Sequence, residues 1–175
     1  ALAYEAAFYI DLAKQGDQKA KDRVDLLTPI VKSWCTDMAV DVSSTTIQVY
    51  GGMGFIEETG VAQYYRDSRI LPIYEGTNGI QANDLVFRKV ISNKGSLVDS
   101  WLSETRDVLS KLSFENSDLN MNERLLKSLE CLNNSKQWLI DNATTNIDSV
   151  AASANGFLNG FAIIAGGVLL ARSAS

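Results

Sequence analysis

The sequence predicts an all-α protein. Apolar residues recur along most of the chain at the spacing that buries one face of a helix. Proline, which interrupts helices, occurs only at Pro29 and Pro72. The chain has 175 residues, of which 46% are apolar and 21% are charged, so it is expected to bury a substantial core.

The first two predicted helices lie on either side of Gly16. The first begins at the start of the chain and ends at Gly16, and Asp17 is the predicted cap of the second. We expect an interruption near Pro29, because proline suits the first turn of a new helix and lacks the N–H that a helix interior needs. The new helix runs to about Tyr50, and its predicted buried face consists of Ile30, Trp34, Met38 and Val42.

An irregular connection is predicted for residues 51–75, with one short helix around Val61–Ser68. It begins with a group of glycines, Gly51, Gly52 and Gly54. A connection of this length inside a compact domain usually has a function. A regular helix is expected to resume after Thr77, and its predicted inner face consists of Ile80, Leu85, Val86 and Val90.

Three more helices are predicted, at about 97–112, 122–141 and 147–172, with a short polar linker at 113–120. Within the last helix, residues 156–171 carry no charge and include four glycines. A membrane span needs roughly 20 apolar residues, so this run is short for one. We expect a core helix that packs closely through its glycines, and no membrane span.

The composition excludes several classes of function. The chain has no histidine, which removes the usual general base and the usual zinc ligand, and no metal site is expected. Its net charge of −5 argues against a nucleic-acid-binding surface. Cys35 and Cys131 lie far apart and are interpreted as reduced thiols, so we expect a cytoplasmic protein.

Glu75 is the most informative carboxylate. It precedes a predicted helix in the sequence Ile-Tyr-Glu-Gly-Thr, where a surface carboxylate would interact favourably with the helix dipole. The alternative is a catalytic base, because Ile73 and Tyr74 offer apolar neighbours and Gly76 lets a ligand approach the backbone. Thr77 adds a hydroxyl at the start of the helix, a position that favours ligand binding. The residues alone leave both interpretations open.

Three motifs in order resemble the acyl-CoA dehydrogenase family. A helix ends in Q-x-x-G-G at Gln48, Gly51 and Gly52, an Arg66-Asp67 pair follows, and Tyr74-Glu75-Gly76-Thr77 completes the pattern. The resemblance covers about residues 1–93 and implies a flavoprotein. Residues 1–94 are interpreted as its C-terminal domain of the four-helix-bundle type, without the first helix. Residues 95–175 resemble the helical extension of a larger-subunit branch.

The resemblance implies a role for each motif. Glu75 resembles the base that removes the α-proton of an acyl-CoA, and Tyr74 and Gly76 resemble the residues that flank the bound thioester. Thr77 resembles a residue that contacts the FAD cofactor, and Gln48, Gly51 and Gly52 resemble the segment that reaches the FAD of a neighbouring subunit. Many family members have glutamine two positions after this threonine, where this chain has Gly79, so Gly79 is left out of the site. Arg66 and Asp67 are interpreted as structural, and Tyr64 and Tyr65 as packing residues.

The resemblance also implies partners. Electron-transfer flavoprotein is the expected electron acceptor, acyl-CoA the expected substrate, and the protein is expected to be a homo-oligomer. The chain lacks an initial Met and a cap before its first helix, so we expect a fragment that is inactive alone. Three alternatives stay open: an acyl-CoA oxidase, a non-catalytic helical oligomerisation module derived from the family, and a nucleic-acid-binding relative, which the charge argues against.

Overall fold

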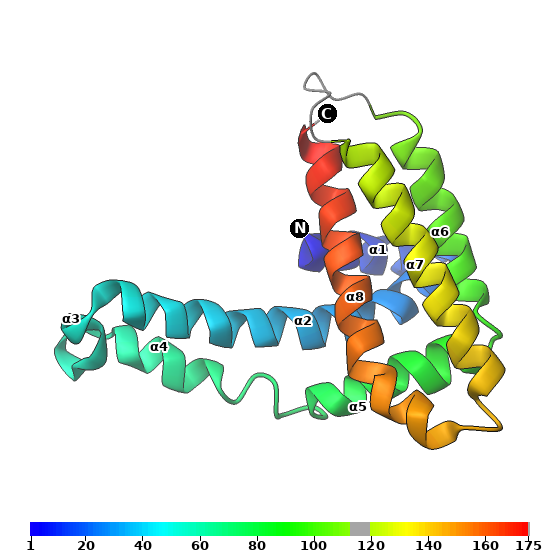
Figure 1. Cartoon of the computed structure of the whole chain (residues 1–175). Helices are drawn as coiled ribbons and strands as arrows, with labels where there is room; N and C mark the ends of the chain where they lie inside the picture. The colour runs from blue at the N-terminus through cyan, green and yellow to red at the C-terminus, as the bar shows by residue number, and fades with distance from the viewer. Residues whose placement is uncertain (113–119, 175) are drawn as a thin grey trace.

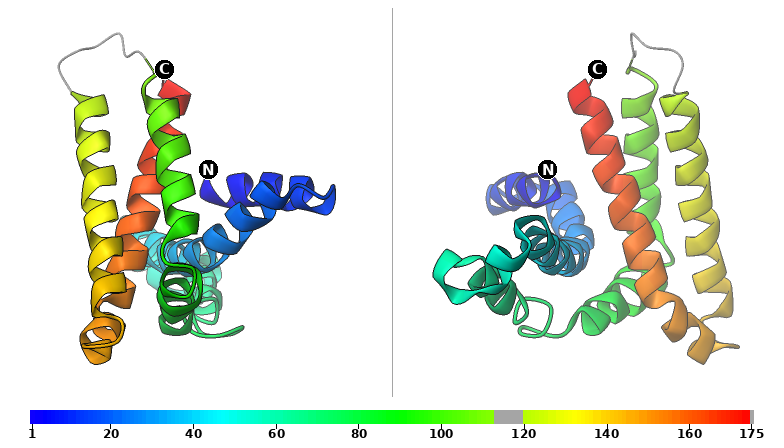
Figure 2. Two further views of the ribbon diagram at one scale, coloured as in Figure 1. Left: turned by 90° about the vertical axis from the view of Figure 1, so that its right-hand side faces the viewer. Right: turned by 60° about the vertical axis from the view of Figure 1, so that its left-hand side comes forward.

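The structure, a computed structural model, describes residues 1–112 and 120–174. These residues form helices joined by turns and contain no β-strand, so the all-α prediction is confirmed (Figure 1). Most of the predicted linker at 113–120 lies outside the described residues. Helix α2 (Gln18–Tyr50) runs across the molecule, whereas α6 (Ser96–Leu109), α7 (Met121–Asn142) and α8 (Ile147–Ala174) stand side by side and roughly perpendicular to it, as Figure 2 also shows.

Helices α1 (Leu2–Lys14) and α2 (Gln18–Tyr50) begin the chain. The predicted cap of α2 is confirmed, since the Asp17 carboxylate accepts a hydrogen bond of 3.1 Å from the Ala20 backbone N–H. The predicted interruption at Pro29 is wrong, because α2 is one helix with Pro29 inside it. Proline in a helix interior costs about 3 kcal/mol, but Leu26, Leu27 and Ile30 around it are at most 1% exposed. Burial of each contributes roughly 1.5–3 kcal/mol and outweighs that cost.

The predicted buried face of α2 is confirmed only in its first half. Ile30 is fully buried and Trp34 packs against the core. Met38 and Val42 are 37% and 59% exposed, so their predicted burial is wrong. The reason is the length of α2, whose second half extends beyond the body of the molecule and is accompanied there, within the described part of the chain, only by the segment that returns along it (Figure 1).

That returning segment consists of α3 (Gly52–Phe55), the 3₁₀ turn η1 (Glu57–Thr59) and α4 (Val61–Ser68). Arg66 ties it together: its Nη1 and Nη2 donate to the two carboxylate oxygens of Glu57 over 2.7 and 2.9 Å. The structural role predicted for Arg66 is thus performed with Glu57. Tyr65 is half-buried, whereas Tyr64 is 75% exposed, so the packing role predicted for Tyr64 is wrong.

The helix after Thr77 is less regular than predicted. Helix α5 (Asn78–Asn83) continues into a π-helical segment, η2 (Asp84–Ile91). Leu85, Val86 and Val90 are fully buried as predicted. Ile80 is 57% exposed, so its predicted place on the inner face is wrong. It lies in the first turn of α5, on the same stretch of surface as the exposed residues just before that helix.

Helices α6 (Ser96–Leu109), α7 (Met121–Asn142) and α8 (Ile147–Ala174) form the second part of the chain. One buried apolar cluster joins them to the first part: it includes Ile30 and Val86 as well as Trp101 and Phe161, whose rings stack edge to face with centroids 4.7 Å apart. The predicted packing of the extension against the first part is confirmed. The boundary at residue 94 itself stays a prediction.

Helix α8 is long and apolar enough to cross a membrane, and 44% of its most apolar 18-residue window is buried in the molecule. Core helices of soluble proteins share this composition, and the absence of a membrane span stays a prediction. The predicted close packing through glycines is wrong for Gly156 and Gly160, because a Cβ added at either would meet no atom within 4 Å. At Gly167 it would meet Leu125 at 3.5 Å, an ordinary contact.

Candidate functional site

The Tyr74–Thr77 segment forms a tight turn between α4 and α5. The Asn78 backbone N–H donates to the Pro72 carbonyl oxygen over 3.1 Å and closes the turn. Glu75 and Gly76 have φ angles of 57° and 84°, in the left-handed region. Such a conformation is ordinary for glycine but unfavourable for a residue with a Cβ, so the conformation at Glu75 requires support from its surroundings.

The side chains of Tyr74, Glu75 and Thr77 all face solvent. Glu75 is exposed and Tyr74 is 47% exposed, so the burial expected around the carboxylate is wrong for this chain. Its apolar neighbour Ile73 is itself 50% exposed. The turn lies on the surface and no other described segment covers it, so Ile73 and Tyr74 form an open apolar rim next to Glu75.

The start of α5 supports the turn from one side. The Thr77 hydroxyl oxygen accepts a hydrogen bond of 3.4 Å from the Ile80 backbone N–H, which confirms Thr77 at the helix N-terminus. The Gln81 side-chain amide donates to the Glu75 carbonyl oxygen over 3.2 Å. A Cβ added at Gly76 would lie 3.4 Å from both the Gln81 amide and Ile80, so the backbone turns close to α5 here.

Helix α2 supports the turn from the other side, through residues that sequence reasoning missed. The Lys32 ammonium group donates to the Gly76 carbonyl oxygen over 2.8 Å and to the Asn78 side-chain oxygen over 2.9 Å. The Asn78 side-chain amide donates in turn to the Asp37 carboxylate over 2.7 Å. Lys32 and Asn78 are far apart in the sequence, and no short motif joins them, so no local signal could have revealed this contact.

The second predicted group of cofactor residues lies at the far end of α2. The Gly51 backbone N–H donates to the Gln48 carbonyl oxygen over 3.2 Å and ends the helix, with a φ of 60° at Gly51. Thr36, whose hydroxyl accepts a hydrogen bond from the Asn78 amide beside the turn, lies about 22 Å from Gly51 along α2, at a rise of about 1.5 Å per residue. The structure therefore does not bring Gln48, Gly51 and Gly52 together with the turn around Glu75. A Cβ at Gly51 or Gly52 would meet no atom within 4 Å, so their backbone is open to a large ligand.

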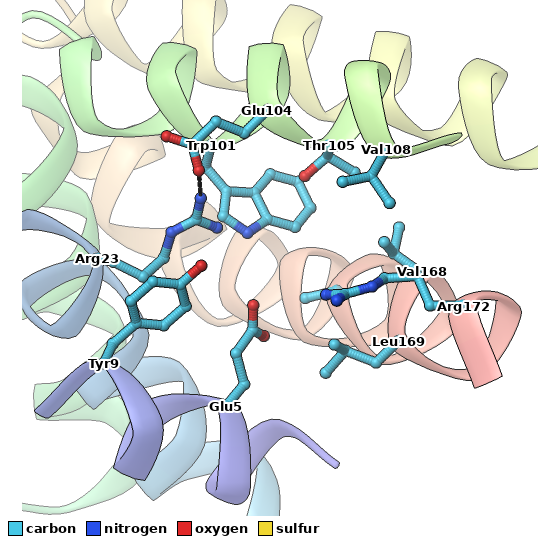
Figure 3. A pocket seen from close by; sticks show the side chains of 11 residues that line it. Glu5, Tyr9, Arg23, Trp101, Glu104, Thr105, Val108, Val168, Leu169 and Arg172 are labelled. Carbon is cyan, nitrogen blue, oxygen red and sulfur yellow. Dashed lines mark hydrogen bonds and ion pairs between the residues drawn. The ribbon is translucent and has the colours of Figure 1, made fainter. Parts of the chain in front are cut away.

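A small polar cavity of about 60 Å³ lies where α1, α2, α6 and α8 meet (Figure 3). Arg23, only 9% exposed, pairs with Glu104, and its guanidinium carbon lies 5.3 Å from the centre of the Tyr9 ring. Burial raises the pKa of Glu5, although Arg23 and Arg172 act to lower it. The two acids and two arginines balance in charge, so the cavity lacks an excess charge that would select an ionic ligand. Among the described residues, no group of acids and cysteines is arranged to hold a metal ion.

The described part of the chain is an all-α domain in which a glycine ends the long helix α2 and a glutamate lies in a left-handed turn before the capped helix α5. Residues 2–89 match the family described as the C-terminal domain of acyl-CoA dehydrogenase. The chain therefore belongs to the acyl-CoA dehydrogenase family, as the resemblance in sequence implies.

Known relatives agree with this assignment. The chain is 54% identical over 99 residues to 3-methylmercaptopropionyl-CoA dehydrogenase of Ruegeria pomeroyi. This match covers 54% of this chain and 17% of that protein. It is 36% identical over 115 residues to a butyryl-CoA dehydrogenase of Syntrophomonas wolfei, and this match covers 63% of this chain and 19% of the relative. The chain thus spans less than a fifth of these relatives.

A solved structure matches almost the whole chain. The crystal structure of Caenorhabditis elegans ACDH-11 in complex with C11-CoA superposes with a TM-score of 0.85 at 24% identity, over 99% of this chain and 30% of that one. The match includes α6, α7 and α8, so the extension belongs to the same fold.

Proposed function

We propose that this chain is the C-terminal helical part of a flavin-dependent acyl-CoA dehydrogenase, which converts an acyl-CoA thioester to the trans-2-enoyl-CoA. The observation that carries the proposal is the turn at Glu75. In this turn the Glu75 backbone is held in the left-handed region between two helices, and its carboxylate is exposed and open to a ligand. A helix-end carboxylate with only a dipole to satisfy would not need that conformation.

Glu75 is the proposed general base. Its carboxylate would take the α-proton of the thioester, and Tyr74 and Gly76 would flank the bound substrate. Among the described residues, none accepts a hydrogen bond from the Glu75 backbone N–H, so this N–H can donate to the thioester carbonyl oxygen. A donor at that position stabilises the negative charge that develops there as the proton leaves.

The residues present fit an FAD cofactor. When bound, FAD would supply the acceptor for the β-hydrogen of the substrate, transferred as hydride. Thr77 would contact the cofactor beside the base, at an exposed helix N-terminus. Gln48, Gly51 and Gly52 would reach the FAD of a neighbouring subunit, and their distance from the turn along α2 supports this division. The protein would then act as a homo-oligomer, with electron-transfer flavoprotein as its electron acceptor.

The substitution Glu75→Gln in the complete enzyme tests the proposal. It preserves the shape of the side chain but removes the proton acceptor. Flavin reduction by acyl-CoA, followed by anaerobic stopped-flow absorbance, should slow by at least about a hundredfold, the low end of what general-base catalysis contributes. The exposed Glu58 offers a matched control, and Glu58→Gln should reduce the flavin at the wild-type rate. A wild-type rate in Glu75→Gln would place the base elsewhere.

A further inference from the structure

The hydrogen bonds between α2 and the Glu75 turn form one connected network. Asn78 lies between two opposite charges on α2: its side-chain oxygen accepts from the Lys32 ammonium group over 2.9 Å, and its amide nitrogen donates to the Asp37 carboxylate over 2.7 Å. The same nitrogen lies 3.1 Å from the Ser33 carbonyl oxygen and 3.0 Å from the Thr36 hydroxyl. The two charges fix the orientation of the Asn78 amide. Reversing the amide would place its nitrogen, a donor, against the Lys32 ammonium group and its oxygen, an acceptor, against the Asp37 carboxylate.

Lys32 is the member of this network that reaches the turn itself. Its ammonium group donates to the Gly76 carbonyl oxygen over 2.8 Å. Gly76 directly follows Glu75, the residue that bears the carboxylate. Lys32 is half-buried on α2, a helix anchored in the core through Leu26 and Ile30. Hydrogen bonds from a charged donor are about twice as strong as those between neutral groups. Lys32 therefore connects the turn to a helix that is anchored in the core.

The left-handed backbone at Glu75 makes such a connection necessary. A residue with a Cβ leaves this region readily unless its surroundings hold it there. Gln81 holds the Glu75 carbonyl oxygen from α5, and Lys32 holds the next carbonyl oxygen from α2. The carbonyl oxygens of the two consecutive peptide groups that follow Glu75 are therefore both held, which restricts the backbone on the C-terminal side of Glu75.

We propose that Lys32 is a positioning residue for Glu75, which it serves by holding the Gly76 carbonyl oxygen and the Asn78 side chain against α2. The proposal rests on the function proposed for Glu75, but it makes a separate statement about the turn. In the absence of the Lys32 ammonium group, the turn should sample other backbone conformations, and the carboxylate should spend less time where it can reach the α-proton.

The first test uses the chain itself and involves no catalysis. The Asn78 backbone N–H closes the turn on Pro72, so its hydrogen exchange, measured by NMR, reports opening of the turn. Lys32→Met removes the donor and should accelerate that exchange by about tenfold or more, whereas Lys32→Arg should stay near the wild-type rate. Lys21→Met, at an exposed lysine of the same helix, should leave the exchange unchanged. If Lys32→Met does not fold, as judged by circular dichroism, Lys32→Gln replaces it.

The second test uses the complete enzyme. Lys32→Met should slow flavin reduction at saturating acyl-CoA by about tenfold, with a much smaller change in the concentration needed for half-saturation, and Lys32→Arg should restore most of the rate. Unchanged Asn78 exchange in Lys32→Met, or an unchanged reduction rate, would overturn the positioning role. A wild-type rate in Glu75→Gln would overturn the proposed function instead, and the exchange result would still decide whether Lys32 holds the turn.

Discussion

Gly95→Ala should destabilise the protein at the junction between its two parts. Gly95 directly precedes α6, with a φ of 81° and its N–H donating to the Val90 carbonyl oxygen over 2.8 Å. A Cβ at this position would lie 2.8 Å from Cδ of Lys136 and 3.0 Å from Cδ1 of Ile140. Lys136 cannot move aside freely, because it is 5% exposed and its ammonium group pairs with Asp99.

The expected loss follows from two contributions. A left-handed conformation costs about 1–2 kcal/mol for a residue with a Cβ. Forcing an extra methyl group into a packed site costs about 1–3 kcal/mol more. We therefore expect Gly95→Ala to lower the free energy of unfolding by about 2–5 kcal/mol, a large fraction of the stability of a domain.

Urea unfolding at pH 7, followed by circular dichroism, measures this loss. Lys94 is a matched control, because it is the neighbouring residue, is exposed and also has a positive φ, of 55°. Lys94→Gly relieves the conformational cost but adds chain entropy to the unfolded state, so the net change should stay within about 1 kcal/mol. A change of less than about 0.5 kcal/mol for Gly95→Ala would refute the reasoning, since both contributions exceed that value.

In α8, Gly156→Ala and Gly160→Ala should each raise the free energy of unfolding by about 0.5–1 kcal/mol, because alanine favours a helix and the added methyl meets no atom; a loss in urea unfolding would show that this face is covered. Glu5→Gln should raise the melting temperature at pH 7 but leave it unchanged at about pH 3. Burial raises the pKa of Glu5 above its ordinary value of 4.5, so the folded state loses stability as pH rises from 4.5 through the raised pKa, and equal melting temperatures at pH 7 would contradict this. Cys131, which is exposed, should react with a thiol reagent faster than Cys35, which is half-buried and has a pKa raised by that burial. Single Cys→Ser variants assign the two reaction rates.

Local signals in the sequence were sufficient for two of the helix starts and for part of the buried core. Asp17 caps α2 through an interaction three residues away, and Thr77 caps α5 in the same way, so both can be identified from a few neighbouring residues. Helical spacing likewise identified the buried positions Leu85, Val86 and Val90.

The errors arose where a local rule depends on distant packing. A proline such as Pro29 interrupts a helix only if the turns on either side of it bury too little apolar surface to offset its cost. Here the buried residues on both sides of Pro29 hold α2 together. Met38 and Ile80 have the spacing of buried residues but lie where the described chain offers no covering surface. Spacing shows which face of a helix is apolar; it does not show how far the neighbouring elements extend along that face.

Under the proposed function, the geometry of the base and its desolvation have different origins. The turn is held by Lys32 from α2 and by Gln81 from α5, both within this chain. The apolar rim is open, since Ile73 and Tyr74 are 50% and 47% exposed. A carboxylate that removes a weakly acidic α-proton works best when water is excluded from it. That exclusion has to come from whatever covers the rim, whether the bound acyl-CoA or other parts of the enzyme. The chain therefore positions Glu75 but leaves its reactivity to the complete site.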